Sequence, residues 1–195
     1  MPHRDVEVGD NGDAPYASGP ELFGTKSGKI VMRLSGHNVR VIFFDDYWRT
    51  HREENIGYET SAEKRVASHS LLITKGAVVH LLDLLEKTGS RFVAPEGASV
   101  STGGLSLSRT ALHSTFGQMK SREEPSEELL GRRCRVYSVD DEAWGYRAKF
   151  WFWKNIPLKA VVQGTEMVVT ELSLGGISAS DFTLPEGVTI EADGD

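Results

Sequence analysis

The chain has 195 residues, which is enough for one sizeable domain and short for two. Hydrophobic residues make up 39% of it and charged residues 26%, values typical of a soluble globular protein. The net charge of -6 argues against nucleic acid as the main partner, because phosphate binding requires a concentrated basic surface.

Composition also limits the chemistry that cysteine can supply and the membrane segments that the chain can contain. Cys134 is the single cysteine, so neither an internal disulfide nor a cysteine-based zinc site is expected, and a small buried strand residue is the favoured interpretation. No apolar run approaches the ~18 residues of a membrane span. The polar first fifteen residues lack the apolar core of a signal peptide.

Three regions differ in composition. Residues 1–27 are rich in Asp, Gly, Pro and Asn and predict a flexible N-terminal arm. Residues 28–190 predict a single β-rich domain, because short alternating segments are separated by turn residues. Residues 191–195 predict an acidic tail.

The first half of the domain predicts a series of antiparallel strands. Two-residue alternation of apolar and polar side chains marks strands at 29–34, 39–44, 47–54, 70–74, 77–82 and 91–94. Residues 59–65 predict a polar connection. Lys75-Gly76 predicts a two-residue hairpin turn.

A helix is expected midway, before the strands resume. Residues 103–121 place Leu105, Leu112, Phe116 and Met119 close to one helical face. Ser126 is expected to cap a short second helical turn. Further strands are predicted at 133–139, 148–153, 158–162 and 167–174.

The run Phe150-Trp151-Phe152-Trp153 is the most informative stretch. Successive strand residues point to opposite faces, so Trp151 and Trp153 share one face while Phe150 and Phe152 share the other. The strand at 39–44 is also apolar on both faces. Two apolar faces need two covers. A core layer, the amphipathic helix and a bound lipid-like ligand are the alternatives.

Polar clusters give no catalytic or metal-binding signature. His51, Glu53 and Glu54 could ligate a metal, but a solvated charged strand face is the favoured interpretation. The carboxylates Asp45-Asp46 lie where a strand ends, which explains Asp without an acid/base role. No nucleophile elbow, phosphate loop or zinc-protease motif occurs. We therefore expect no catalytic residues, no metal site and no cofactor.

The expected fold is mainly β. Nine or ten short strands with one or two helices predict a curled antiparallel sheet, a half-barrel, with the helices over its concave side. A β-sandwich is the rival architecture, although a long helix between two meanders fits it less well.

Several segments carry a resemblance to a known family. They are the meander 29–54 with Phe44-Asp45-Asp46-Tyr47, the segment 130–137, the run Phe152-Trp153-Lys154-Asn155-Ile156-Pro157-Leu158-Lys159 and the ending 182–187. Together they resemble the LolA/LolB-like group of outer-membrane lipoprotein-sorting-like proteins, in an uncharacterised branch. The resemblance implies a half-barrel closed by helices, an apolar concavity for acyl chains, and a periplasmic or cell-envelope location. The chain departs from the dedicated carriers in lacking a long apolar helix before the first strand.

The leading hypothesis is a non-catalytic envelope protein that binds an apolar ligand such as lipid or lipoprotein acyl chains. The expected lining comprises Phe43, Trp151 and Trp153, capped by Leu112, Phe116 and Met119. The expected partners are a lipid or acyl chain and an envelope protein. The alternative is a structural or protein-interaction module with a filled core. An enzyme is the third hypothesis and would require His51 or His80 beside a carboxylate in a cleft.

Overall fold

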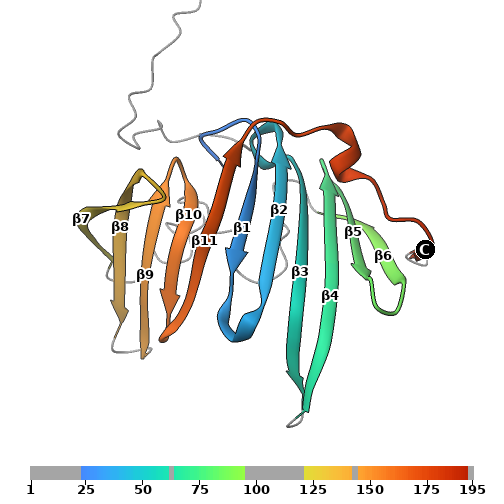
Figure 1. Ribbon diagram of the computed structural model, residues 1–195, viewed down its shortest axis with the longest axis horizontal. Coiled ribbons are helices and arrows are strands. Elements are labelled where there is room, and N and C mark those ends of the chain that lie inside the picture. The colour runs from blue at the N-terminus through green and yellow to red at the C-terminus, as the bar shows by residue number, and fades with distance from the viewer. Residues whose placement is uncertain (1–22, 62–63, 95–120, 142–144, 193–195) are drawn as a thin grey trace, which may run out of the picture.

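The computed structural model describes residues 23–61, 64–94, 121–141 and 145–192 as one twelve-stranded sheet (Figure 1). The strands are β1 (Gly28–Arg33), β2 (Val39–Asp45), β3 (Thr50–Ser61), β4 (Lys64–Lys75), β5 (Val78–Asp83), β6 (Thr88–Val93), β7 (Ser121–Leu129), β8 (Arg132–Asp141), β9 (Tyr146–Trp153), β10 (Ile156–Val162), β11 (Thr165–Leu174) and β12 (Thr189–Ala192). Three 3-10 turns complete the described elements: η1 (Ser35–His37), η2 (Asp46–Trp48) and η3 (Ala179–Phe182).

Two meanders meet in the middle of the sheet. The strand order is β12-β6-β5-β4-β3-β2-β1-β11-β10-β9-β8-β7, so β1 pairs with β11 and joins the first half of the chain to the second. Neighbouring strands are antiparallel except for β12, which returns to pair parallel with β6. The prediction of a mainly β fold made of two meanders is confirmed.

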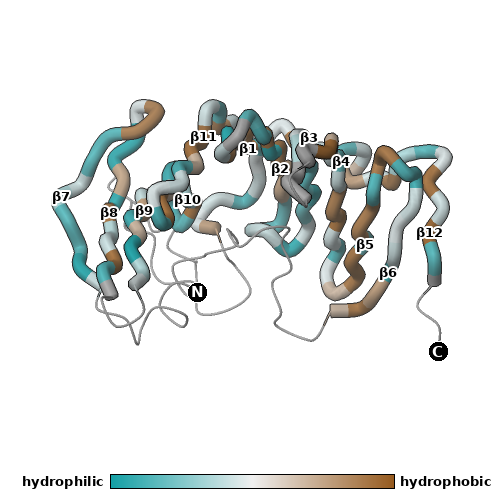
Figure 2. The backbone as a smooth tube through the Cα atoms, turned by 90° about the horizontal axis from the view of Figure 1, so that it is seen from below, coloured by the Kyte–Doolittle hydropathy of each residue, from teal (hydrophilic) through white to brown (hydrophobic). Residues whose placement is uncertain are grey.

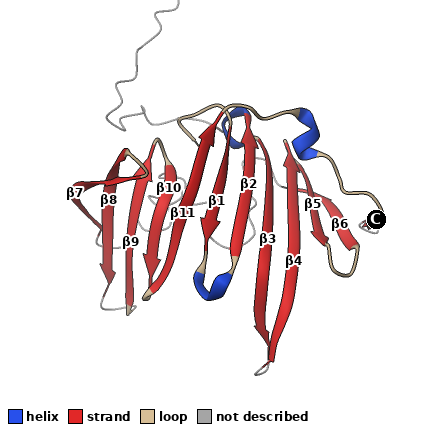
Figure 3. Cartoon of the chain, in the orientation of Figure 1, coloured by secondary structure: helices blue, strands red, loops and turns tan. Residues whose placement is uncertain are grey.

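The sheet is open, so the expected half-barrel is wrong. β7 and β12 lie at opposite edges, and the sheet is not strongly curled (Figures 2 and 3). β7 is mostly exposed and charged, and a bulge interrupts its pairing with β8 beside Pro125. Charged side chains, a bulge and a proline hinder the pairing of an edge strand with another strand. β7 can therefore remain the edge of an open sheet.

The helical expectations have two outcomes. The segment 103–120 lies outside the described residues, and the described ranges contain no α-helix and none able to cross a membrane. The predicted helical turn after Ser126 is wrong, since β7 continues to Leu129. Glu127, Glu128 and Leu129 pair with β8, so strand pairing overrides the local helical preference.

Two hairpins differ in detail from the sequence prediction. β3 continues to Ser61 and β4 begins at Lys64, so strands occupy most of the segment 59–65 that is predicted to be a polar connection. The β4–β5 turn consists of Gly76 and Ala77, one residue later than predicted, because Lys75 pairs with Val78. Gly76 has a φ of 59° at the first turn position, the conformation that glycine tolerates best there.

The aromatic strand β9 is buried on both faces, as its sequence predicts. Trp151 and Trp153 belong to a cluster on the first face, together with Ile30, Ile42 and Phe44. Phe150 and Phe152 form a second cluster on the opposite face with residues of β8 to β11. All four β9 rings are at most 5% exposed.

The chain segment before β1 covers part of the first face. Phe23 is buried, with its ring 5.0 Å from Phe44 and 4.7 Å from Trp48 between centroids. Gly24 N donates a hydrogen bond to Lys154 O at 2.8 Å. Residues 23–27, part of the expected flexible arm, are therefore attached to the sheet.

The chain segment after β11 covers the opposite face of β3 to β5. Phe182 in η3 is 4% exposed and packs against Leu71, Ile73 and Leu82. A capping box fixes η3, because the Ser178 side chain accepts a hydrogen bond from the backbone N–H of Asp181 and Ser178 N donates to Asp181 Oδ2 at 2.7 Å.

We expect Phe182→Ala to lower the free energy of unfolding by about 3–5 kcal/mol, because it removes a buried ring from this cluster. Leu184→Ala is the matched control, since Leu184 is 44% exposed and its loss should change stability by less than about 0.5 kcal/mol. Urea unfolding of both variants measures the difference. Equal effects would contradict this role for Phe182.

Candidate ligand-binding face

A strip of indole rings and cations runs along β9 on the first face of the sheet. Lys149, Trp151 and Trp153 alternate on this strand, so their side chains share a face. Lys149 Nζ lies 4.8 Å and Lys159 Nζ 5.1 Å from the centroid of the Trp151 ring. We call the face formed by Trp151, Trp153 and their neighbouring cations the indole strip.

A second pair of cations lies against Trp153. Arg132 Cζ and Lys154 Nζ are each 4.9 Å from the centroid of its ring. Lysine and arginine bury their apolar stems on such surfaces and keep the charged end in water. Trp151 and Trp153 are only 5% and 4% exposed, in part because cationic side chains lie over their rings.

Carboxylates of edge strand β7 hold the Trp151 end of the strip. The Trp151 indole Nε1 donates to Glu127 Oε2 at 2.8 Å. Lys149 Nζ lies 3.0 Å from both Glu127 Oε1 and Glu124 Oε2, and Arg122 pairs with Glu124 at 3.1 Å. Hydrogen bonds from Lys149, Ser138 and Arg122 lower the pKa of Glu124 to about 2.

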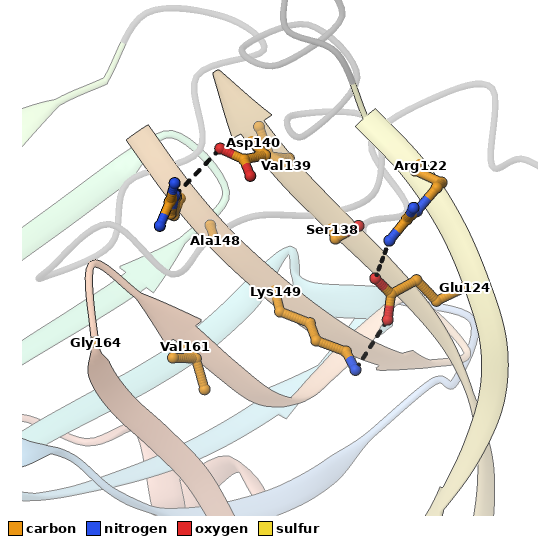
Figure 4. Close-up of a pocket in the computed structure, with 10 residues that line it drawn as sticks. Arg122, Glu124, Ser138, Val139, Asp140, Ala148, Lys149, Val161 and Gly164 are labelled. Atoms are coloured by element: carbon orange, nitrogen blue, oxygen red, sulfur yellow. Dashed lines mark hydrogen bonds and ion pairs between the residues drawn. The ribbon is translucent and has the colours of Figure 1, made fainter. Parts of the chain in front are cut away.

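A groove of about 480 Å³ continues the strip beyond Lys149 (Figure 4). Its lining comes from β7 to β10 and the turn that follows: Arg122, Glu124, Ser138, Val139, Asp140, Arg147, Ala148, Lys149, Val161 and Gly164. Arg147 Nε pairs with Asp140 Oδ1 at 3.3 Å, so the charges of this groove are balanced by their neighbours. Its volume is within the range of small-molecule sites.

The predicted site residues separate into two places. Trp151 and Trp153 lie together on the indole strip. Phe43 is half-buried on the opposite face, where it packs against the Phe182 cluster. Its alternation with the buried Phe44 explains this, since neighbours in a strand face opposite sides. Leu112, Phe116 and Met119 lie outside the described residues.

The expected solvated face of His51 and Glu53 is wrong, because both side chains are buried. His51 is 2% exposed and Glu53 0%. His51 Nε2 lies 3.7 Å from Glu53 Oε1, and Arg40 Nη1 lies 3.9 Å from Glu53 Oε2. The ring of Trp48 stacks on His51 at 4.3 Å between centroids. Burial lowers the pKa of Arg40, while Glu53 acts in the opposite direction.

A second pair of polar residues was missed in the sequence. His69 Nε2 lies 2.7 Å from Glu54 Oε1, and Arg52 Nη2 donates to Glu54 Oε2 at 3.0 Å. Strand pairing places Glu54 opposite Leu71 and His69 opposite Ile56, so these partners meet diagonally across β3 and β4. Across the described ranges, no three His, Cys, Asp or Glu side chains form a group that could hold a metal ion.

Sequence reasoning also missed the cations of the indole strip. Lys149 precedes Trp151 by two residues, a spacing that places both on one face of a strand. Lys154-Asn155 signals a turn, but the sequence does not show that the turn lays Lys154 against Trp153. Arg132 comes from a separate hairpin, so its position depends on strand pairing.

Comparisons with known proteins show the fold alone. No protein-family model and no curated protein matches the chain. An uncharacterized conserved protein from Thermus thermophilus is similar over 86% of this chain and 91% of its own, at 9% identity and a TM-score of 0.54. A "putative outer membrane lipoprotein-sorting protein domain" from Vibrio parahaemolyticus matches over 80% of this chain and 87% of its own, at 12% identity and a TM-score of 0.29.

We expect Lys149→Met to raise the pKa of Glu124 from about 2 toward its ordinary value of 4.5, because the variant removes the largest cause of the shift. A carboxyl with a lowered pKa stabilises the fold fully above its ordinary pKa, and this contribution is lost as the pH falls toward 2. Side-chain carbon NMR over pH 1.5–6 measures it. Glu166, paired with Lys159, is the internal control. An unchanged Glu124 would contradict the assigned cause.

The thiol of Cys134 is expected to be inert in the folded protein. Cys134 is 0% exposed, and burial raises its pKa to about 11. A thiol reagent at pH 8 should label it at least 100-fold more slowly than in urea-unfolded protein. Equal rates would contradict its burial.

Proposed function

We propose that the protein is a non-catalytic binding protein of the cell envelope, whose ligand is an amphiphile such as a lipid or a lipoprotein acyl chain. The observation that carries the proposal is the indole strip. Two tryptophan rings lie side by side on one strand, and their covers include the flexible stems of Lys149 and Lys159. The envelope location follows from the sequence resemblance.

The flexible lysine side chains over Trp151 could move aside and let an apolar ligand bind to the indole strip. Lysine stems have several rotatable bonds, and both amines lie near solvent, with side chains 32% and 26% exposed. An acyl chain that takes their place over Trp151 would gain about 0.8 kcal/mol for each methylene removed from water. The groove beyond Lys149 continues the strip and lengthens the surface that a ligand could contact.

A second candidate function has its own supporting observation. The β3–β4 hairpin extends beyond its neighbours at one end of the sheet (Figure 1). Along it, Ile56 and Tyr58 share one face and are 45% and 47% exposed, and Val66 on the other face is 53% exposed. Apolar side chains at such an exposed place suit a protein-interaction module with a filled core, since exposed apolar patches often mark contact surfaces.

Binding of a fluorescent fatty acid discriminates between the two. We expect saturable binding to the purified protein, and about fivefold weaker binding by Trp153→Leu, because a smaller side chain loses roughly 1 kcal/mol of aromatic contact. Tyr58→Ser is the matched control and should bind as the original chain does.

Native mass spectrometry and solvent extraction of the purified protein provide the complementary measurement. Extracted lipid together with probe binding supports the proposed function. Absence of extractable lipid combined with a failure to bind the probe would overturn it and favour the interaction module.

A further inference from the structure

We propose that Arg132 and Lys154 hold the anionic group of the bound amphiphile, a phosphate-type oxyanion, at the Trp153 end of the indole strip. This inference rests on the proposed function, because it identifies the headgroup chemistry of the same ligand. It assigns a polar role to two residues that flank an otherwise apolar ring.

Charge balance along the strip selects these two residues. Lys149 is neutralised by Glu124 and Glu127, and Lys159 pairs with Glu166 at 2.7 Å. Within the described parts of the chain, no carboxylate lies within ion-pair distance of Arg132 or Lys154. Arg132 Nη1 donates a hydrogen bond to the carbonyl of Leu130 at 2.9 Å. No described carboxylate therefore compensates the positive charge at the Trp153 end of the strip.

Two tight turns bring the charges together. Leu130 and Gly131 have φ values of 53° and 67°, and Lys154 and Asn155 have 46° and 63°, the left-handed pairs of type I′ hairpin turns. Arg132 begins β8 directly after the first turn, and Lys154 follows the last residue of β9. Because β8 and β9 are antiparallel neighbours, both turns lie at the same end of the sheet (Figure 1).

Backbone contacts fix the second turn. Lys154 O accepts a hydrogen bond from Gly24 N at 2.8 Å, which ties the turn to the segment that carries Phe23. Each cationic group is 4.9 Å from the same ring centroid, so the two charges are no more than about 10 Å apart.

The chemistry of the pair fits a phosphate better than a neutral headgroup. Arginine presents a planar fork that binds phosphate oxygens in a bidentate way, and lysine adds a point charge. Both side chains are half-buried against Trp153, where a lower effective dielectric strengthens attraction for an anion. In the groove at the other end, the cations are already paired with Glu124 and Asp140, so they offer an anion less free positive charge.

Calorimetric titration with two soluble amphiphiles of equal chain length tests the inference. Decyl phosphate carries the anionic group, and decyl glucoside is its neutral counterpart. We expect the double variant Arg132→Gln/Lys154→Gln to bind decyl phosphate at least tenfold more weakly, with a smaller salt dependence, while decyl glucoside binding is unchanged. Lys29→Gln/Arg49→Gln removes the same charge elsewhere and should leave both affinities as they are.

The outcomes separate the two proposals. If both amphiphiles bind and the double variant changes neither affinity, the anion site is wrong and the proposed function stands. If neither amphiphile binds, the proposed function and the inference both fail. Inorganic phosphate provides the third arm. If it binds as tightly as decyl phosphate and with the same dependence on Arg132 and Lys154, the anion site stands and the apolar ligand is contradicted.

Discussion

A single layer of strands that is apolar on both faces must have both faces covered, and the rest of this structure follows from that constraint. In β9, Trp151 and Trp153 point one way and Phe150 and Phe152 the other, and all four rings are buried. In a two-layer sandwich, each sheet buries one face against the other sheet and leaves its second face to solvent. Both faces of this single sheet must instead be covered by other parts of the structure. Some apolar side chains are covered by backbone segments and others by single charged side chains. The first arrangement marks regions that stabilise the fold, and the second marks the candidate site.

Two covers are rigid. The segment around Phe23 packs edge-to-face on Phe44 and is hydrogen-bonded to the β9–β10 turn. On the other face, Phe182 is held by a capped 3-10 turn against strands β4 and β5. Displacing either segment would expose several large apolar side chains at once, so these regions are suited to stability rather than to reversible binding.

The covers over the indole strip are different, because they include single side chains with charged ends. Lysine and arginine stems can leave a ring without moving the backbone, and each charge can remain in water as they do so. The acidic side chains of β7 neutralise one end of the strip, whereas among the described residues no carboxylate pairs with Arg132 or Lys154 at the other end. An apolar surface with one charged end is complementary to an amphiphile, and this asymmetry gives the proposed ligand a direction.

Local patterns in the sequence predict much of the fold. Alternation predicts the early strands and the burial of both faces of 150–153, and turn residues locate most of the hairpins. The sequence does not predict the full length of the β3–β4 hairpin, because its polar residues resemble a connection. In the structure Glu54 and His69 are partners across this hairpin. The sequence also does not predict that Glu127 lies in a strand, because it follows Pro125 in a charged segment. It becomes a strand residue through the pairing of β7 with β8.

The candidate site is less predictable, because it depends on contacts between distant segments. Nothing local to Arg132 shows that it lies on Trp153, and the burial of Arg40 beside Glu53 depends on pairing between β2 and β3. Phe43 illustrates the opposite error, because strand alternation alone does not show which face of 39–44 lies on the same side of the sheet as Trp151. The register of β2 places it on the other face.

We propose that the indole strip holds the apolar part of a ligand. Quenching of tryptophan fluorescence by an amphiphile that is brominated on its acyl chain tests this proposal. Bromine quenches only rings that it contacts. We expect strong, saturable quenching that is lost in Trp151→Phe/Trp153→Phe and retained in Trp48→Phe. Quenching that survives the loss of Trp151 and Trp153, or an amphiphile that binds without quenching, would contradict it.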